Sequence, residues 1–285
     1  MSIENKLNIN LDSYLTCKDY TVSNTSFQVQ KNKEYELLVT QPIPKNLEDY
    51  YKSEDYISHT DSKKSLTDIL YQTVKNYTLK KKISLLNSFK TDNKKVLDFG
   101  AGTGDFLGAC KNNNWEVFGV EPNLKAREIA AKKGITILSD ISELKNIQFD
   151  VITLWHVLEH VEKLEETILR LKELLTQNGV LIIAVPNYKS YDANHYKEFW
   201  AAYDVPRHLW HFSQTSISKI FSEFSMNVEK TLPMKFDSYY VSLLSEKYKT
   251  GKTNFFKAFK VGFLSNKKAK KTTEYSSLIY CLKKS

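Results

Sequence analysis

The stretch VLDFGAGTGDFL, residues 96–107, constrains the fold more than any other part of the chain. An apolar strand pattern leads directly into three glycines, and a helical pattern follows them at once. The glycines are Gly100, Gly102 and Gly104, and glycine lets backbone N–H groups approach a ligand closely. The spacing is G-x-G-x-G, which is neither the dinucleotide pattern G-x-G-x-x-G nor a phosphate-binding loop with Gly-Lys-Ser/Thr. The stretch therefore predicts a ligand-binding turn between a strand and a helix.

Strand and helix patterns alternate on both sides of this turn. Apolar strand patterns occur at 95–99, 115–120, 135–138, 149–155, 180–186 and 276–284. Helical patterns lie at 104–112, 123–134 and 161–179, and an earlier one runs from Leu66 to Phe89. Several of the strands are apolar on both faces, which is typical of a parallel sheet covered by helices. We therefore expect an α/β domain over residues 61–285, with a Rossmann-like sheet and helices on both faces.

The first 60 residues differ in character from the rest. They are polar and rich in tyrosine, and two short apolar alternations, SFQVQ and YELLV, suit edge strands. The three cysteines, Cys17, Cys110 and Cys281, stand far apart and form neither a C-x-x-C zinc pair nor a disulfide framework. The N-terminus shows no secretion signal, and no apolar run is long enough to span a membrane. We expect a small N-terminal appendage over residues 1–60, and reduced thiols in a cytoplasmic protein.

Two acids follow the next two strands of the expected sheet. Glu121 ends VFGVE, and Asp140 ends ITILSD. An acid at the first position can accept hydrogen bonds from both hydroxyls of a ribose, as in nucleotide-binding folds. An acid at the second position can reach an adenine amino group. Either acid alone would equally suit a cap or a solvated charge, but the glycine turn and both acids in this order indicate a cofactor that contains a nucleoside.

Five segments resemble, in order, the successive motifs of a known family: VLDFGAGTGDFL, VFGVEPN, ILSD, FDVITLWHVLEHV and GVLIIAVPN. The family is the class I S-adenosylmethionine-dependent methyltransferases, and the similarity is greatest to the branch of ubiquinone-type and sugar methyltransferases. It covers about residues 85–285, and it implies a seven-stranded sheet with S-adenosyl-L-methionine as cofactor. The residues that it implies for cofactor binding are Asp98, Phe99, Gly100, Ala101, Gly102, Gly104, Glu121, Pro122, Asp140, Ile141, Trp155 and His156.

The stretch WHVLEH, Trp155 to His160, also matches a different pattern. Its H-x-x-E-H spacing occurs in inverted zinc metalloproteases, where it lies on a helix. His156 falls at the end of an expected strand, so it is not expected to share a helical face with His160. Some ubiquinone-type relatives bind a divalent metal through acids near this point, but the sequence as a whole predicts no metal. Glu159 and His160 suit either a first helical turn or a place beside the substrate.

Residues 195–213, HYKEFWAAYDVPRHLWHFS, form what we call the acceptor segment, because in the resembling family this part of the chain covers the acceptor. The segment combines six aromatic residues with three histidines, which suits a pocket that binds a planar or sugar-like molecule and moves a proton. Arg207 could grip a carboxylate or phosphate, and Ser213 suits a helix N-cap. The candidate substrate-binding residues are Tyr203, Asp204, Arg207, His208 and His211. The candidate general bases are His156, His160 and His208, and the sequence does not choose among them.

The basic charge of the chain belongs to its C-terminal part. The net charge is +8, yet the residues from 247 onward alone contain eleven lysines and one acid, Glu274. Phenylalanines recur four residues apart within the basic segment 247–271, at Phe255, Phe259 and Phe263. These rings could cover the sheet between its last two strands while the lysines stay in solvent. They could instead form a basic amphipathic helix that contacts an anionic membrane through residues 253–271, or serve a phosphate-bearing or nucleic-acid partner.

Together these features predict methyl transfer from S-adenosyl-L-methionine to a small-molecule acceptor, as O-methylation of a sugar-, quinol- or lipid-linked hydroxyl. A sulfonium methyl group is already activated, so the protein has to supply alignment and charge stabilisation. A nucleic-acid methyltransferase stays open as an alternative that the lysines favour, although the sequence contains neither an N-P-P-Y motif nor a Pro-Cys pair. An inactive cofactor-binding scaffold is the other alternative. The oligomeric state is not indicated by the sequence.

Overall fold

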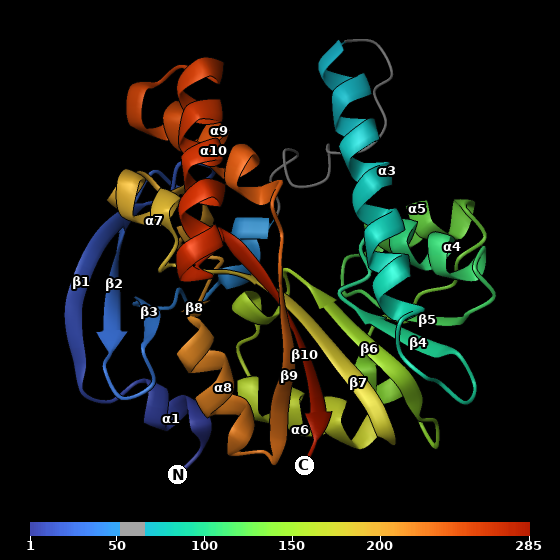
Figure 1. Cartoon of the computed structure of the whole chain (residues 1–285). Helices are drawn as coiled ribbons and strands as arrows, with labels where there is room; N and C mark the ends of the chain where they lie inside the picture. The colour runs from blue at the N-terminus through green and yellow to red at the C-terminus, as the bar shows by residue number, and fades with distance from the viewer. Residues whose placement is uncertain (52–65) are drawn as a thin grey trace.

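The computed structural model describes residues 1–51 and 66–285, and it confirms the expected α/β architecture (Figure 1). Its larger sheet has the strand order β5-β4-β6-β7-β10-β9. The strands are β4 (Lys95–Phe99), β5 (Glu116–Val120), β6 (Phe149–Trp155), β7 (Leu175–Pro186), β9 (Met226–Pro233) and β10 (Ser277–Lys284). The first four are parallel, and β10 is inserted antiparallel between β7 and β9. The strand order reverses at β4, and ligands bind beside the carboxyl end of such a strand.

Over the residues that the structure describes, the larger sheet has six strands and not the expected seven. The segment that was expected to form the missing strand joins β5 through a single parallel bridge between Leu138 and Val120. In this bridge the Leu138 N–H donates to the Gly119 carbonyl oxygen, and the Leu138 carbonyl oxygen accepts from the Glu121 N–H, both at 2.9 Å. The pairing stops there because the chain enters a 3₁₀ turn, η2 (Ile141–Glu143), directly afterwards.

Helices flank this sheet at nearly the expected positions (Figure 1). They are α3 (Leu66–Leu86), α4 (Asp105–Lys111), α5 (Leu124–Lys132), α6 (Leu164–Leu174) and α8 (Gln214–Ser222). The Ser213 side chain caps α8 by accepting from the Ser216 N–H, as predicted. The helix expected over 161–179 ends earlier, at Leu174, because Leu175 already pairs with Phe149 as the first residue of β7.

The appendage forms a second sheet that also takes in a strand from the acceptor segment. Its strand order is β1-β2-β3-β8. The strands are β1 (Leu11–Lys18), β2 (Ser26–Asn32), β3 (Leu37–Gln41) and β8 (Trp210–His211), preceded by helix α1 (Ile3–Leu7). SFQVQ and the last three residues of YELLV therefore lie in this separate sheet. Leu38 of β3 pairs with His211 of β8. The Thr40 hydroxyl also donates to the His208 carbonyl oxygen at 2.7 Å, so the appendage holds the acceptor segment directly. The expected boundary at residue 60 lies outside the described residues.

Three further helices pack against one another: α7 (Tyr191–Tyr196), α9 (Asp237–Thr250) and α10 (Phe255–Thr272). Asp192 of α7 is buried and accepts hydrogen bonds from the Trp200 indole at 2.8 Å, and from the Ser265 and Ser276 hydroxyls at 2.6 Å. Through these bonds Asp192 connects the acceptor segment, α10 and the residue directly before β10. Within the two described ranges, no helix is both long enough and apolar enough to cross a membrane.

Small residues line the contact between α9 and α10, which form a helical hairpin. The buried residues are Ser238, Val241, Ser242, Ser245 and Glu246 on α9, and Ala258, Val261, Gly262, Ser265 and Ala269 on α10. A Cβ atom at Gly262 would lie 2.7 Å from Tyr239 Cδ1 and 3.0 Å from Tyr239 Cα. The two helix backbones therefore approach more closely than a side chain at this position allows.

Gly262→Ala should lower the free energy of unfolding by about 1–3 kcal/mol, because the added methyl group meets backbone atoms that cannot move aside. Urea denaturation monitored by circular dichroism measures the change. Gly108→Ala in α4 is the matched control, since beyond its own helix no atom of the described residues lies within 4 Å of the added carbon, and alanine favours helix by up to about 1 kcal/mol. Equal effects of the two substitutions would contradict the tight crossing.

Candidate active site

The glycine turn after β4 has the backbone that its sequence predicts. Gly100, Gly102 and Gly104 have φ angles of +79°, +51° and +74°, in the left-handed region where other residues are strained. Gly100 is also crowded, since a Cβ atom there would lie 2.4 Å from Val157 Cγ2. The Gly100 N–H donates to the Val120 carbonyl oxygen at 2.8 Å, which fixes the turn to β5. The turn therefore presents backbone groups at the carboxyl end of β4.

Glu121 lies beside this turn, directly after β5. Its carboxylate accepts hydrogen bonds from the Gly102 and Asn123 N–H groups, each at 2.9 Å. A carboxylate offers about four lone-pair sites, so Glu121 can accept two further bonds, as both hydroxyls of a ribose require. The neighbouring residues predicted for the cofactor are Phe99 at the end of β4, Ala101 buried in the turn and Pro122 exposed after Glu121.

Asp140 is exposed and caps the 3₁₀ turn η2. Its side chain accepts from the Ser142 N–H at 2.8 Å, and Glu143 completes the capping box by accepting from the Asp140 N–H at 3.0 Å. The hydrogen bonds from Ser142 lower the pKa of Asp140, so the side chain is a carboxylate at neutral pH. Ile141 is half-buried against the core. A role for Asp140 and Ile141 in binding adenine stays a prediction.

Asp98 and Lys82 place a buried carboxylate and a cation beside the turn. Asp98 accepts from the Thr153 hydroxyl at 2.6 Å, and burial raises its pKa, although Thr153 and Lys82 oppose this. Lys82 of α3 places its Nζ atom 3.9 Å from the centre of the Trp155 ring, a cation–π contact. Burial lowers the pKa of Lys82, although the charges of Asp98 and Asp237 oppose this. The buried Trp155 Nε1 has no partner among the described residues, so this donor is available to a bound molecule.

His156 lies directly after β6, where two carboxylates hold its ring. Its Nδ1 is 3.3 Å from Glu159 Oε1, and its Nε2 is 3.2 Å from Asp237 Oδ2. Burial alone would lower the pKa of His156, but the hydrogen bonds with Asp237 and Glu159 raise it to about 10. A ring that donates from both nitrogens is an imidazolium, so His156 has no lone pair for a substrate proton at neutral pH. Among the three candidate bases, this geometry favours the other two.

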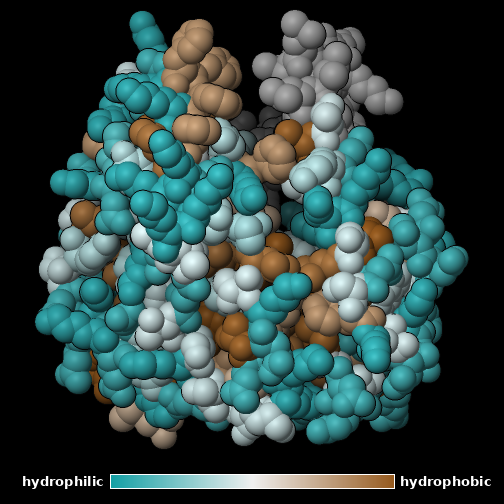
Figure 2. All heavy atoms as spheres, in the orientation of Figure 1, coloured by the Kyte–Doolittle hydropathy of each residue, from teal (hydrophilic) through white to brown (hydrophobic). Residues whose placement is uncertain are grey.

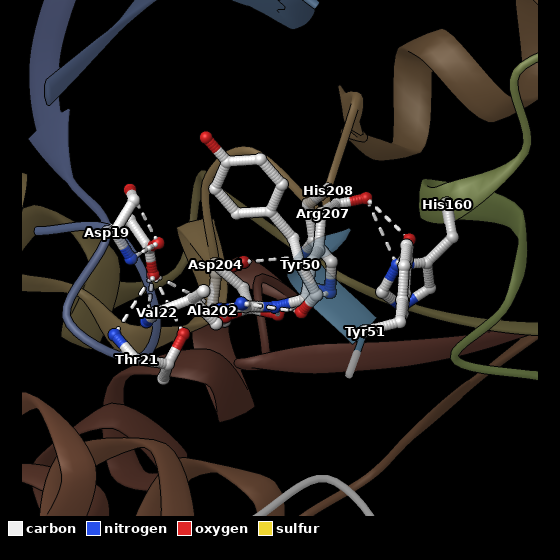
Figure 3. Close-up of polar contacts among 11 residues, drawn as sticks. Asp19, Thr21, Val22, Tyr50, Tyr51, His160, Ala202, Asp204, Arg207 and His208 are labelled. Atoms are coloured by element: carbon white, nitrogen blue, oxygen red, sulfur yellow. Dashed lines mark hydrogen bonds and ion pairs between the residues drawn. The ribbon is translucent and has the colours of Figure 1, made fainter. Parts of the chain in front are cut away.

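The turn that follows, η3 (Leu158–His160), brings His160 against the acceptor segment. The rings of His160 and His208 meet edge to face with their centres 4.5 Å apart. His160 Nδ1 lies 3.1 Å from the Tyr51 hydroxyl oxygen and 3.1 Å from the Arg207 carbonyl oxygen (Figure 3). Burial, together with the charge of His208, lowers the pKa of His160 to about 4. His160 is therefore neutral at physiological pH and can accept a proton.

Glu159 completes a group of three potential metal ligands. One donor atom each of Glu159, His160 and His208 lies within 4.8 Å of the others. Glu159 is buried, and its Oε2 has no partner among the described residues. Two imidazoles and a carboxylate can hold a divalent cation such as Zn²⁺. The metalloprotease pattern H-x-x-E-H does not account for this group, because His156 lies before the 3₁₀ turn that holds Glu159 and His160. The third member of the group, His208, belongs to the acceptor segment.

Arg207 is buried and joins the acceptor segment to the appendage (Figure 3). Its Nε donates to Asp204 Oδ2 at 2.9 Å, and its Nη2 donates to Asp204 Oδ1. The same Nη2 lies 3.7 Å from Asp19 Oδ1, and Nη1 donates to the Tyr50 carbonyl oxygen at 3.3 Å. Burial alone would raise the pKa of Asp204, but the hydrogen bonds from Arg207 lower it. Arg207 thus grips a carboxylate of the protein itself, and these contacts favour a positioning role.

Tyr203 and His211 lie in the interior between the acceptor segment and the appendage. Both are buried, with their ring centres 5.2 Å apart. His211 Nε2 lies 2.9 Å from the Thr40 hydroxyl oxygen of β3, and burial lowers the pKa of His211. Direct contact of either residue with a substrate stays a prediction.

Three residues beside the site were not predicted from the sequence: Tyr51, Lys82 and Asp237. Lys82 ends a run of three lysines, which by itself indicates a solvated helix face. Asp237 begins α9, where an acid is common because it complements the helix dipole. Tyr51 lies in η1 (Leu47–Tyr51), in the part of the appendage with no strong pattern. Their roles depend on partners far away in the sequence.

Comparison with known proteins identifies the class. Residues 71–231 match the family model described as a methyltransferase domain, so the chain belongs to this methyltransferase family. An uncharacterised methyltransferase from Oceanobacillus iheyensis is 33% identical over 106 residues, which are 35% of this chain and 50% of that protein. One from Anoxybacillus flavithermus is 32% identical over 96 residues, 31% of this chain and 45% of that protein. The chain thus spans about half the length of the curated relatives it matches.

Solved structures show the same fold. Magnesium protoporphyrin IX methyltransferase from Synechocystis with bound SAH superposes with a TM-score of 0.55 at 16% identity, over 83% of this chain and 97% of that chain. Coclaurine N-methyltransferase bound to N-methylheliamine and SAH gives a TM-score of 0.51 at 15% identity, over 85% of this chain and 81% of that chain. At these identities the likeness concerns the fold alone.

The pKa values of His156 and His160 should lie far apart. We expect His156 to keep both ring protons up to a pH of about 10 and His160 to lose its charge near pH 4. Ring nitrogen shifts of ¹⁵N-labelled protein, followed by NMR against pH, measure both. Because the folded-state pKa of His156 lies above its usual 6.5, its ion pairs stabilise the fold fully below about 6.5, and this stability is lost as the pH rises through about 10.

Asp237→Asn should bring the pKa of His156 down, because one of its two carboxylate partners loses its charge. The exposed ring of His195 is the internal reference in the same spectra. Titration of His156 near 6.5 in the unmodified chain would contradict the double ion pair.

Proposed function

We propose that this chain transfers a methyl group from S-adenosyl-L-methionine to a small-molecule acceptor. The main support is the glycine turn after β4, which has three positive φ angles and donates a backbone hydrogen bond to the Glu121 carboxylate. Membership of a methyltransferase family supports the reaction. The SAH bound by two fold neighbours supports the choice of cofactor.

The residues around the turn suit each part of this cofactor. Glu121 can accept the ribose hydroxyls, and the exposed region of Asp140 and Ile141 can take the adenine. The amino-acid end of the cofactor carries one ammonium and one carboxylate. Beside the turn, Asp98 offers a carboxylate for this ammonium and Lys82 offers an ammonium for this carboxylate. Burial disfavours the charged forms of Asp98 and Lys82, and a bound partner of opposite charge would offset that cost. The unpartnered Trp155 indole N–H offers a further donor.

When bound, the cofactor supplies a methyl group activated by a sulfonium. The chain has to hold the acceptor atom in line with this methyl group and to exclude water. Trp155 and His156 lie consecutively at the end of β6, and the ion pairs of His156 with Glu159 and Asp237 fix the next turn and α9 against it. This continuity supports a cofactor position next to the cluster of Tyr51, His160 and His208.

We infer an oxygen acceptor from the chemistry of that cluster. A hydroxyl group has to lose its proton as it is methylated, and the neutral imidazole of His160 can take this proton. The Tyr51 hydroxyl, 3.1 Å from His160 Nδ1, can bond the same acceptor. A sugar-, quinol- or lipid-linked hydroxyl suits this arrangement, in agreement with the branch of the family that the sequence resembles.

Glu121→Ala should weaken S-adenosyl-L-methionine binding by about 1.5–3 kcal/mol, because the two ribose hydroxyls would be left without their acceptor. Isothermal titration calorimetry measures the change. Glu128→Ala is the matched control, since Glu128 is exposed one turn along α5 and should leave the affinity unchanged. Equal affinities for all three proteins would contradict the cofactor site.

Release of the demethylated cofactor, measured over a panel of quinols, nucleotide sugars and polyprenyl-linked sugars, tests the reaction itself. Turnover on a hydroxyl acceptor that is lost in Glu121→Ala at limiting cofactor supports the proposal. Tight cofactor binding with no turnover on any acceptor would instead indicate an inactive scaffold.

A further inference from the structure

Helix α10 buries its small residues and exposes its phenylalanines. Phe255, Phe256, Phe259 and Phe263 are 60%, 92%, 63% and 50% exposed. The face that packs against α9 consists of the small residues around Gly262. The expectation that these rings cover the sheet between its last two strands is therefore wrong, because α10 buries Val261 and its small residues and leaves the rings exposed. Four exposed phenylalanines on one helix need another explanation, since large exposed apolar patches mark interaction sites.

The exposed rings form one stripe with lysines beside it. At 3.6 residues per turn, the four phenylalanines fall within a sector of roughly 100° around α10. Lysines occupy the neighbouring sector and the last turns of the helix, all exposed: Lys257, Lys260, Lys267, Lys268, Lys270 and Lys271. Residues 247–271 contain nine lysines and no acid. Figure 2 shows a group of apolar residues at the outer end of the α9–α10 hairpin, beside strongly hydrophilic surface.

We propose that α10 docks on an anionic membrane surface. An amphipathic helix with aromatic residues on one face and lysines beside them lies in the plane of the headgroups, with its apolar face inserted. Each lysine close to an anionic surface adds roughly 1 kcal/mol of attraction. A second copy of the chain is a poor occupant for the stripe, because the lysines of two hairpins would repel each other. A nucleic acid would satisfy the lysines but would leave most of the apolar stripe in water.

The hairpin is also connected to the candidate active site. α9 begins at Asp237, whose carboxylate lies 3.2 Å from His156 Nε2. Tyr248, near the other end of α9, lines a small cavity together with Asp204 and Arg207 of the acceptor segment. A docked hairpin would therefore hold the acceptor segment close to the lipid surface. This step rests on the proposed function and suits a lipid-linked acceptor, whereas the docking itself does not depend on methyl transfer.

Co-sedimentation with vesicles at low and moderate salt tests the docking on the full chain without cofactor. We expect binding to phosphatidylcholine vesicles that contain phosphatidylglycerol, weaker binding at moderate salt, and little binding to phosphatidylcholine alone. The double variant Phe256→Ser, Phe259→Ser should bind at least about tenfold more weakly, because two inserted rings are removed. Phe256 is almost fully exposed, whereas the ring of Phe259 also packs against Tyr239 of α9 with the ring centres 5.1 Å apart. A circular dichroism melt therefore has to show that the double variant is folded at the assay temperature.

Leu169→Ser is the matched control, since Leu169 is 44% exposed on α6 at the opposite end of the molecule. It should bind vesicles like the unmodified chain. The charge variant Lys267→Glu, Lys270→Glu should bind the anionic vesicles more weakly and show a smaller salt dependence. Failure of the unmodified chain to pellet at low salt would overturn the proposal, as would undiminished pelleting of the phenylalanine variant. A concentration-dependent dimer that dissociates in the phenylalanine variant, with no vesicle binding, would assign the stripe to a second copy instead.

Discussion

The buried cation of Arg207 is the interaction on which the acceptor side of the molecule depends. It grips Asp204 with two hydrogen bonds and donates to the Tyr50 carbonyl oxygen. A buried charge that loses a partner destabilises a protein by about 3–5 kcal/mol. The acceptor segment and the appendage therefore have to stay in contact. Tyr51 directly follows Tyr50, and His208 directly follows Arg207. The same contacts therefore determine where a hydroxyl and an imidazole meet beside His160.

The cofactor side of the site could be predicted from the sequence because it is built from residues that are close together in the chain. The turn after β4 has three positive φ angles within five residues. The glycines at these positions, Gly100, Gly102 and Gly104, predict such angles directly. Glu121 could be placed because a strand pattern ends immediately before it. The strand count was wrong because pairing depends on more than an apolar pattern. Leu138 makes one bridge to β5, and Asp140 then caps a turn that carries the chain away.

The contacts of the acceptor side and of the α9–α10 hairpin could not be predicted from the sequence, because they join residues that are far apart in the chain. No local pattern indicates that Leu38 pairs with His211, or that Asp237 reaches His156. The sequence shows phenylalanines and lysines spaced along α10, but the face that becomes buried depends on how closely α9 approaches. That approach is set at Gly262 by the backbone of Tyr239. The phenylalanines consequently lie outside.

A crystal structure with bound S-adenosylhomocysteine tests most directly whether these two sides form one methyl-transfer site. We predict its ribose hydroxyls on Glu121, its amino-acid end between Asp98 and Lys82, and its sulfur atom beside Trp155. The space in front of the sulfur should then be lined by the cluster of Tyr51, His160 and His208. A ligand bound elsewhere, or a sulfur atom that faces away from this cluster, would contradict the assignment of the acceptor site.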